Sequence, residues 1–127
     1  MKIAALIARL LLGLVFFIFG LNGFLQFIPA PPLPPGTMGQ FAGALSASHF
    51  IYVVAAFQVA GGALLLVNRY VPLAMVLLGP VIVNIFFFHL LMDRHGLPLA
   101  IVVMILWGIL FLRHKQHFSG IFVERTS

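Results

Sequence analysis

Four stretches of this chain are long and apolar enough to cross a lipid bilayer, and they leave little room for any other fold. They lie at residues 3–28, 46–67, 71–92 and 98–112. A helix crosses the hydrocarbon core with about 20 apolar residues, and only helices or closed barrels satisfy their backbone polar groups there. Charged residues make up 7% of the chain, against about one quarter in soluble domains. The sequence therefore predicts an all-α integral membrane protein, an antiparallel four-helix bundle that forms one membrane domain over residues 1–127.

The segments outside the spans set the predicted topology. Residues 29–45 are a proline-rich loop in which Thr37 and Gln40 have the spacing of a capping box, so we expect a short extracytoplasmic helix there. Residues 113–127 are a basic tail that we expect to meet anionic lipid headgroups. Lys and Arg gather at the start, between the second and third spans, and in this tail. The positive-inside rule then places both termini in the cytoplasm, in a multi-pass protein of the cytoplasmic (inner) membrane whose first span is not cleaved.

Several classes of function are excluded by what the chain lacks. It has no cysteine, which removes disulfides, thiolate catalysis, iron–sulfur clusters and cysteine metal sites. Its formal charge of +5 comes from Lys and Arg scattered beside the spans, so topology explains the charge better than nucleic-acid binding does. His114 and His117 have helical spacing but no third ligand, and neither a phosphate-cradling glycine loop nor a nucleophile elbow occurs. We assign no metal site, no nucleotide site and no catalytic residue.

Two amides lie at mid-membrane depth by a count of about 1.5 Å per helical residue. They are Gln58 in the second span and Asn84 in the third. A polar group in hydrocarbon needs a partner, and an amide pair across two helices satisfies both groups and fixes their register. We predict that Gln58 and Asn84 form such an interhelical pair. A ligand-binding role is the alternative.

A second group of polar residues belongs to the extracytoplasmic half. Asn22 and Gln26 are four residues apart and share a helix face, as do His89 and Asp93, and His49 begins the second span at a similar height. We predict one pocket lined by these side chains, where hydrogen-bond donors beside Phe86 to Phe88 suit a quinone headgroup. The alternative is that His89 and Asp93 form only a satisfied interfacial pair.

Three local features concern how the helices pack. Arg9 lies two turns inside the first span, where snorkelling to the headgroups is favoured over an inward-facing functional role. Gly13, Gly20 and Gly23, and the run from Ala60 to Ala63, predict close approach between helices. The Gly79-Pro80 pair predicts a kink in the third span.

Two apolar segments resemble a known family. The first is Arg9-Leu-Leu-Leu-Gly-Leu-Val-Phe-Phe-Ile-Phe-Gly20, and the second is Phe57-Gln-Val-Ala-Gly-Gly-Ala-Leu-Leu-Leu66 followed by Asn68-Arg69. Both are similar to span signatures of the DoxX family, with a further likeness over residues 84–89. The resemblance implies a small four-span membrane protein tied to quinone-linked or sulfur redox systems and to oxidative-stress complexes. The position that is commonly acidic in the family is Gln58 here, whose amide does not titrate.

Together these observations favour an accessory or quinone-interacting subunit of a membrane redox or oxidative-stress system. The chain has no self-contained catalytic motif, so any redox activity would be that of a subunit of a quinone-linked oxidoreductase. We expect the lipid bilayer, other membrane or redox subunits, or further copies of the chain as partners, and no nucleic acid. The alternatives are a non-catalytic membrane scaffold or assembly protein and a small transporter, the latter disfavoured because no span carries a charge at its midplane.

Overall fold

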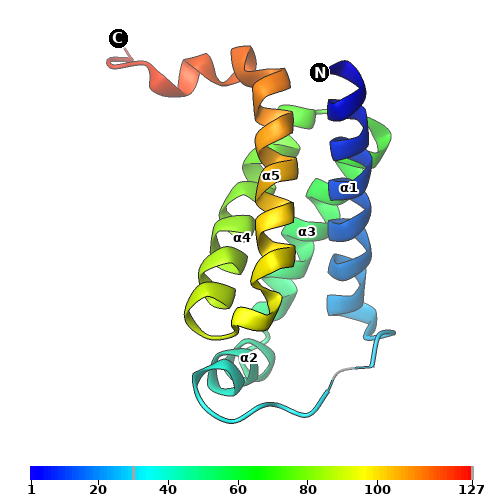
Figure 1. The fold of residues 1–127 in the computed structure, drawn as a ribbon, viewed down its shortest axis with the longest axis vertical. Helices are drawn as coiled ribbons and strands as arrows, with labels where there is room; N and C mark the ends of the chain where they lie inside the picture. Colours follow the sequence, from blue (N-terminus) through cyan, green and yellow to red (C-terminus); the bar gives the residue numbers. More distant parts are fainter. Residues whose placement is uncertain (30, 127) are drawn as a thin grey trace.

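Four long helices run alternately up and down in a computed structural model that describes residues 1–29 and 31–126 (Figure 1). They are α1 (Lys2–Leu25), α3 (Phe50–Val67), α4 (Val71–Leu91) and α5 (Leu97–His114). A shorter helix, α2 (Thr37–Ala47), precedes α3, and the 3-10 turns η1 (Arg94–Gly96) and η2 (Lys115–Phe122) flank α5. No strand occurs in the described residues. Four helical runs are long and apolar enough to cross a membrane, which confirms the predicted all-α membrane bundle.

The four long helices form a closed ring. α1 packs on α3 and α5, and α4 packs on the same two helices. The interior is filled by large apolar side chains with almost no exposed surface, contributed by all four helices: Leu12, Phe16, Leu65, Met75, Leu78 and Leu110. Many other large apolar residues face outward, which is the surface that a bilayer would cover. Both termini lie at one end of the bundle and α2 lies at the other (Figure 1).

Small residues bring α1 and α3 into close contact, as predicted. A Cβ atom added to Gly13 would lie 3.1 Å from the carbonyl oxygen of Gly62, and one added to Gly23 would lie 2.7 Å from the Cβ of Ala55. The adjacent Gly61 faces the other way, because its added Cβ would lie 2.5 Å from Cγ of Leu78 in α4. Two consecutive glycines thus let α3 pack tightly against both of its neighbours.

The helix ends near α2 are set by local backbone conformation, which cannot be predicted from hydropathy. α1 stops at Leu25, three residues short of the predicted end, because Gln26 takes a left-handed conformation with φ 52°. α3 begins at Phe50 instead of residue 46, because α2 continues to Ala47 and His49 turns the chain with φ 64°. A hydrogen bond from the Phe50 N–H to Ser48 Oγ, 3.2 Å long, supports this turn.

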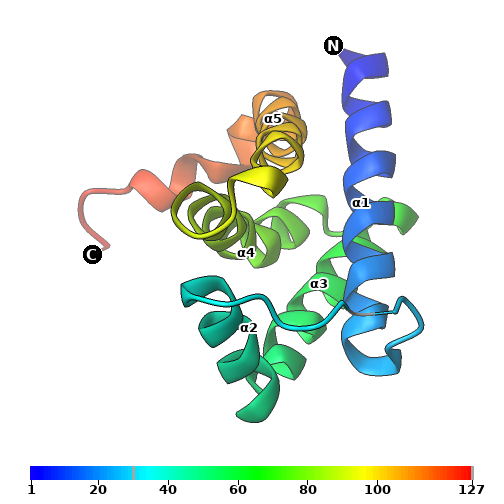
Figure 2. The same cartoon turned by 60° about the horizontal axis from the view of Figure 1, so that its bottom comes forward.

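The start of α2 corrects one local prediction. The expected short helix is present, but its N-cap is Gly36, at φ 83°, and no side chain caps it. Thr37 is already inside the helix, so it does not form the capping box that the Thr-x-x-Gln spacing suggested. A glycine at this position accommodates the positive φ that a threonine would resist. The helix then lies beside the ends of α3 and α4 (Figure 2).

Trp107 fixes α5 against α4. Its indole Nε1–H donates to the carbonyl oxygen of Met75 across a 3.1 Å distance, and its ring stacks on Phe111 with centroids 5.7 Å apart. The bond satisfies a donor that would otherwise be unpaired in an apolar setting. α4 itself continues without a break past Pro80.

Candidate functional site

A cavity of about 610 Å³ opens between α2, α3 and α4, and we call it the α2–α3–α4 cavity. Its wall is mostly apolar and aromatic, and it is lined by Phe41, Ala42, Leu45, Phe50, Ile51, Val53, Val54, Phe57, Gln58, Pro80, Val81, Asn84, Ile85, Phe88 and His89. Phe41 of α2 stacks on Phe88 of α4 with ring centroids 5.3 Å apart, and both rings line the cavity. Several wall residues, including Phe50, Val53 and Phe57, are also exposed on the outer surface. The cavity is therefore open at the surface of the bundle.

Two amides provide the polar groups in the middle of this wall. Asn84 Nδ2 donates to the carbonyl oxygen of Pro80, 2.8 Å away on the preceding turn, which leaves its second N–H and its Oδ1 free. The side chain of Gln58 makes no hydrogen bond within the described residues. Every fully buried polar side-chain atom in these residues has a hydrogen-bond partner, so the unpaired amide atoms of Gln58 are not fully buried. The amide of Gln58 is therefore accessible, and both amides can donate to a ligand oxygen.

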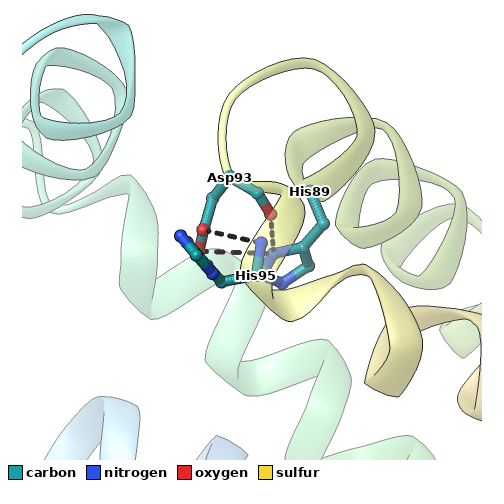
Figure 3. Close-up of polar contacts among 3 residues, drawn as sticks. All are labelled: His89, Asp93 and His95. Atoms are coloured by element: carbon teal, nitrogen blue, oxygen red, sulfur yellow. Dashed lines mark hydrogen bonds and ion pairs between the residues drawn. The ribbon is translucent and has the colours of Figure 1, made fainter.

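His89 lies in the same wall near the end of α4, where it is held by Asp93. Its Nδ1 lies 3.1 Å from the backbone oxygen of Asp93 and 3.6 Å from Oδ2 of that residue (Figure 3). A carbonyl oxygen only accepts, so Nδ1 carries the hydrogen and Nε2 of the neutral ring is left as an acceptor. Asp93 also accepts from the backbone N–H of His95 at 3.2 Å, which holds the carboxylate at the start of η1.

Gly96 fixes the imidazole from the other side. A Cβ atom added at this position would collide with Cε1 and Nδ1 of His89. The α4–α5 connection can therefore pass directly over the ring only because residue 96 has no side chain. The orientation of His89 is set by two elements, its own helix through Asp93 and the following turn through Gly96.

Of the five residues predicted to share a pocket, His89 is the one that lines the α2–α3–α4 cavity. His89 pairs with Asp93, whereas Asn22, Gln26 and His49 are not in the cavity wall. Asn22 Oδ1 accepts from the Ile28 N–H at 2.8 Å, and Gln26 is the left-handed cap of α1. These two residues shape the turn that ends α1.

His49 has a similar local role at the start of α3. It is the left-handed N-cap of the helix, and its ring stacks on Tyr52 with centroids 5.8 Å apart. Tyr52 in turn stacks on Phe24 of α1 at 5.6 Å. The three rings form an aromatic column at the α2 end of the bundle, where amphipathic rings suit a membrane interface.

Gln58 and Asn84 are brought to the same cavity but are not hydrogen-bonded to each other in the described residues. The depth count correctly placed them in one region. What it could not anticipate is the bond from Asn84 to Pro80, a local alternative that an asparagine side chain can find on its own helix.

The side chain of Arg9 reaches the C-terminal end of the neighbouring helix α3. Its Nη1 donates to the carbonyl oxygens of Leu65 and Leu66, the latter at 3.4 Å. These carbonyls are at the C-terminal end of α3, where a cation is stabilised by the partial negative charge of the helix end. The sequence signals an arginine two turns inside a span, but only the fold shows that the end of α3 lies beside it.

The sequence reasoning also did not identify Phe41, the aromatic residue that α2 contributes to the cavity wall. Nothing in the sequence indicates that the short helix places Phe41 against α4. Of the phenylalanines named beside His89, Phe88 lines the cavity. Over residues 1–29 and 31–126, no group of three His, Asp or Glu side chains is arranged to hold a metal ion.

Comparison with known sequences gives one match. The sequence model of the DoxX family matches residues 4–90, which cover α2 and α3 and nearly all of α1 and α4. The matched part contains every residue of the α2–α3–α4 cavity wall. No curated protein and no solved structure matches this chain.

Proposed function

This chain belongs to the DoxX family, and from that premise we propose that it is an accessory subunit of a membrane redox or oxidative-stress system that binds a quinone headgroup in the α2–α3–α4 cavity. The observation that carries the proposal is the wall of this cavity. It combines two accessible amides and a histidine with stacked phenylalanines, and it is open at the surface of the bundle. A quinone has a flat ring, two carbonyl oxygens and an apolar tail, and it reaches its sites through the bilayer.

Size and chemistry both favour such a ligand. The cavity volume of about 610 Å³ lies within the range of roughly 300 to 1,000 Å³ that is typical of small-molecule sites. The amides of Gln58 and Asn84 would donate to a carbonyl oxygen, and the phenylalanines would contact the ring. The acceptor Nε2 of His89 would take a hydrogen bond from a quinol hydroxyl. In this proposal the residues bind and orient the ligand, and partner subunits supply the remaining redox chemistry.

The test is the affinity of the purified full-length chain for a short-tailed ubiquinone, measured by titration in detergent micelles. Asn84→Leu and Gln58→Leu remove donors with little change in volume. Each should weaken binding about fivefold, because a net hydrogen bond contributes about 1 kcal/mol. Gln40→Leu is the matched control, because Gln40 is an exposed amide on α2 outside the cavity wall, and it should leave the affinity unchanged.

Two results would count against the proposal. One is the absence of any retained quinone when the purified protein is extracted with solvent and analysed by mass spectrometry. The other is an equal effect of Asn84→Leu and Gln40→Leu on ubiquinone affinity. Both results are what a non-catalytic scaffold would give, since its polar residues would serve packing alone.

We also propose that both termini are cytoplasmic and that the protein is in the cytoplasmic (inner) membrane. Lys and Arg are concentrated at the end of the bundle that carries the termini, which supports this orientation. The chain has no cysteine, so single labels report without background. A membrane-impermeant thiol reagent added to intact cells should label Leu33→Cys and spare Ser119→Cys. The reverse pattern would invert the topology.

A further inference from the structure

A second cavity, of about 510 Å³, lies at the opposite end of the bundle, where the two termini are. We call it the basic cavity. It is formed by the start of α1, the residue after α3 and the end of α5, and it is lined by Lys2, Ile3, Ala5, Leu6, Arg9, Asn68, Leu110, Arg113 and His114. Nothing in the proposed quinone role uses this cavity, so it requires its own explanation.

The wall of the basic cavity carries positive charge without an acidic partner. Three of its residues, Lys2, Arg9 and Arg113, are cationic, and it contains no carboxylate. The chain has only two acidic residues. Asp93 lies beside His89 at the far end, and no carboxylate contacts Lys2, Arg9 or Arg113 within residues 1–29 and 31–126. The three cations therefore repel one another around a shared hollow, an arrangement that a bound anion would stabilise.

Arg9 is the best-positioned of these cations. Its bonds to the carbonyl oxygens of Leu65 and Leu66 use Nη1 alone and hold the guanidinium against the end of α3. In the described residues Nε and Nη2 have no hydrogen-bond partner. A guanidinium that is held in place and keeps free N–H groups suits the paired oxygens of a phosphate. Arg113 faces the same cavity from α5, so an anion there would meet arginines from two helices.

The rest of the wall shows which kind of anion fits. Ile3, Leu6 and Leu110 give the cavity an apolar surface directly beside the cations, and Ile3 and Leu6 are also exposed on the outside of α1. A free inorganic anion would gain nothing from this surface. A phospholipid would gain from this apolar surface, because its acyl chains begin close to its phosphate. Basic pockets between spans on the cytoplasmic side are a setting in which anionic headgroups bind.

We propose that the basic cavity is a specific binding site for the phosphate group of an anionic phospholipid, with Arg9 and Arg113 as its principal ligands and Lys2 at its rim. The site differs from a general attraction of the basic tail to the membrane, because it depends on residues from α1 and α5 that meet only in the folded bundle. It is independent of the quinone proposal and can hold or fail without it.

The experiment uses the full-length chain, delipidated in a neutral maltoside detergent, with binding followed by native mass spectrometry. The probes are short-chain phosphatidylglycerol, phosphatidylcholine with the same chains, and inorganic phosphate. Phosphatidylglycerol should bind most tightly. Arg113→Gln should weaken its binding about fivefold, the effect of about 1 kcal/mol per basic residue near anionic lipid. Arg125→Gln, which removes a cation of the tail outside the cavity, should change it less than about twofold.

A further pair of variants keeps the test decisive if removal of Arg9 prevents folding. Arg9→Lys keeps the positive charge but loses the planar guanidinium, so this variant should fold. It should nevertheless bind phosphatidylglycerol more weakly than the unaltered chain. Lys2→Gln should have a smaller effect than Arg113→Gln. Equal losses for Arg113→Gln and Arg125→Gln would overturn the proposal in favour of general tail electrostatics. Equal affinity for phosphatidylcholine, or for inorganic phosphate, would overturn the assignment to an anionic lipid.

Discussion

Gly62→Ala is the substitution that most directly tests how the bundle is held together. A Cβ atom at this position would lie 2.5 Å from the backbone nitrogen of Phe17, and 2.9 Å from both Gly13 O and Phe17 Cα. All three atoms belong to the backbone of α1, so no side chain can rotate away to make room. α1 and α3 would have to separate locally by about 1 Å to restore ordinary contact.

The expected cost follows from two opposing terms. Overpacking of a tight interface costs about 1 to 3 kcal/mol, and the upper half applies here because the clash is with rigid backbone. Alanine recovers up to about 1 kcal/mol of helix propensity relative to glycine. We therefore expect Gly62→Ala to lower the free energy of unfolding by about 2 kcal/mol. Gly108→Ala is the matched control, because a Cβ at that position of α5 meets nothing within 4 Å.

The assay is reversible unfolding in mixed micelles, with the fraction of SDS increased and helix content followed by circular dichroism. Gly62→Ala should unfold at a clearly lower SDS fraction than the unaltered chain. Gly108→Ala should unfold at the same or a slightly higher fraction. The reasoning is refuted if the two variants unfold together, since the close approach of α1 and α3 would then not depend on the missing side chain.

Substitutions at three further positions test other contacts. Arg9→Gln removes the cation at the end of α3 and should destabilise the bundle by about 1 to 2 kcal/mol in the same SDS assay. Arg9→Lys should recover part of this loss. An unchanged midpoint for Arg9→Gln would show that the guanidinium does not stabilise the end of α3. Trp107→Phe removes the donor to Met75 O and should cost about 1 kcal/mol, whereas an unchanged midpoint would mean that ring stacking alone holds α5. Gly96→Ala should displace the His89 ring and shift its NMR signals, and unshifted signals would contradict the packing of Gly96 on that ring.

The overall architecture could be predicted because it follows from hydropathy. Long apolar spans must satisfy their backbone polar groups internally in a bilayer, which favours helices, and successive spans of a multi-pass chain alternate in direction. The glycine contacts could also be predicted, since Gly13 and Gly20 are seven residues apart on one face of α1. The short helix before α3 was also expected, although it starts from Gly36 and not from a capping threonine.

The site was harder to predict because it depends on where individual helices stop. A span count that continued α1 past Leu25 and began α3 at Ser46 put Asn22, Gln26 and His49 at the height of His89. The left-handed conformation of Gln26 ends α1 and that of His49 precedes α3, so these two residues belong to turns. α2 then occupies the space beside His89 and supplies Phe41 to the cavity. Hydropathy does not contain this information.

The same limit explains Arg9. Its distance from the start of the chain favoured snorkelling, which is the usual solution for a cation near a helix end. The fold adds a specific partner, since the last carbonyls of α3 lie within reach of its guanidinium. Which helix end lies beside a given residue is a property of the bundle, and no local pattern reveals it.

The most direct test of the central claim is to map where a quinone contacts the protein. A ubiquinone analogue with a photoreactive group on its ring would be irradiated with the purified chain, and the labelled residues would be located by mass spectrometry. We predict labels on the cavity wall in α2, α3 and α4, around Phe41, Gln58 and Asn84, that disappear when excess unlabelled ubiquinone is added. Labels elsewhere on the bundle, or labels that unlabelled ubiquinone does not displace, would contradict the claim.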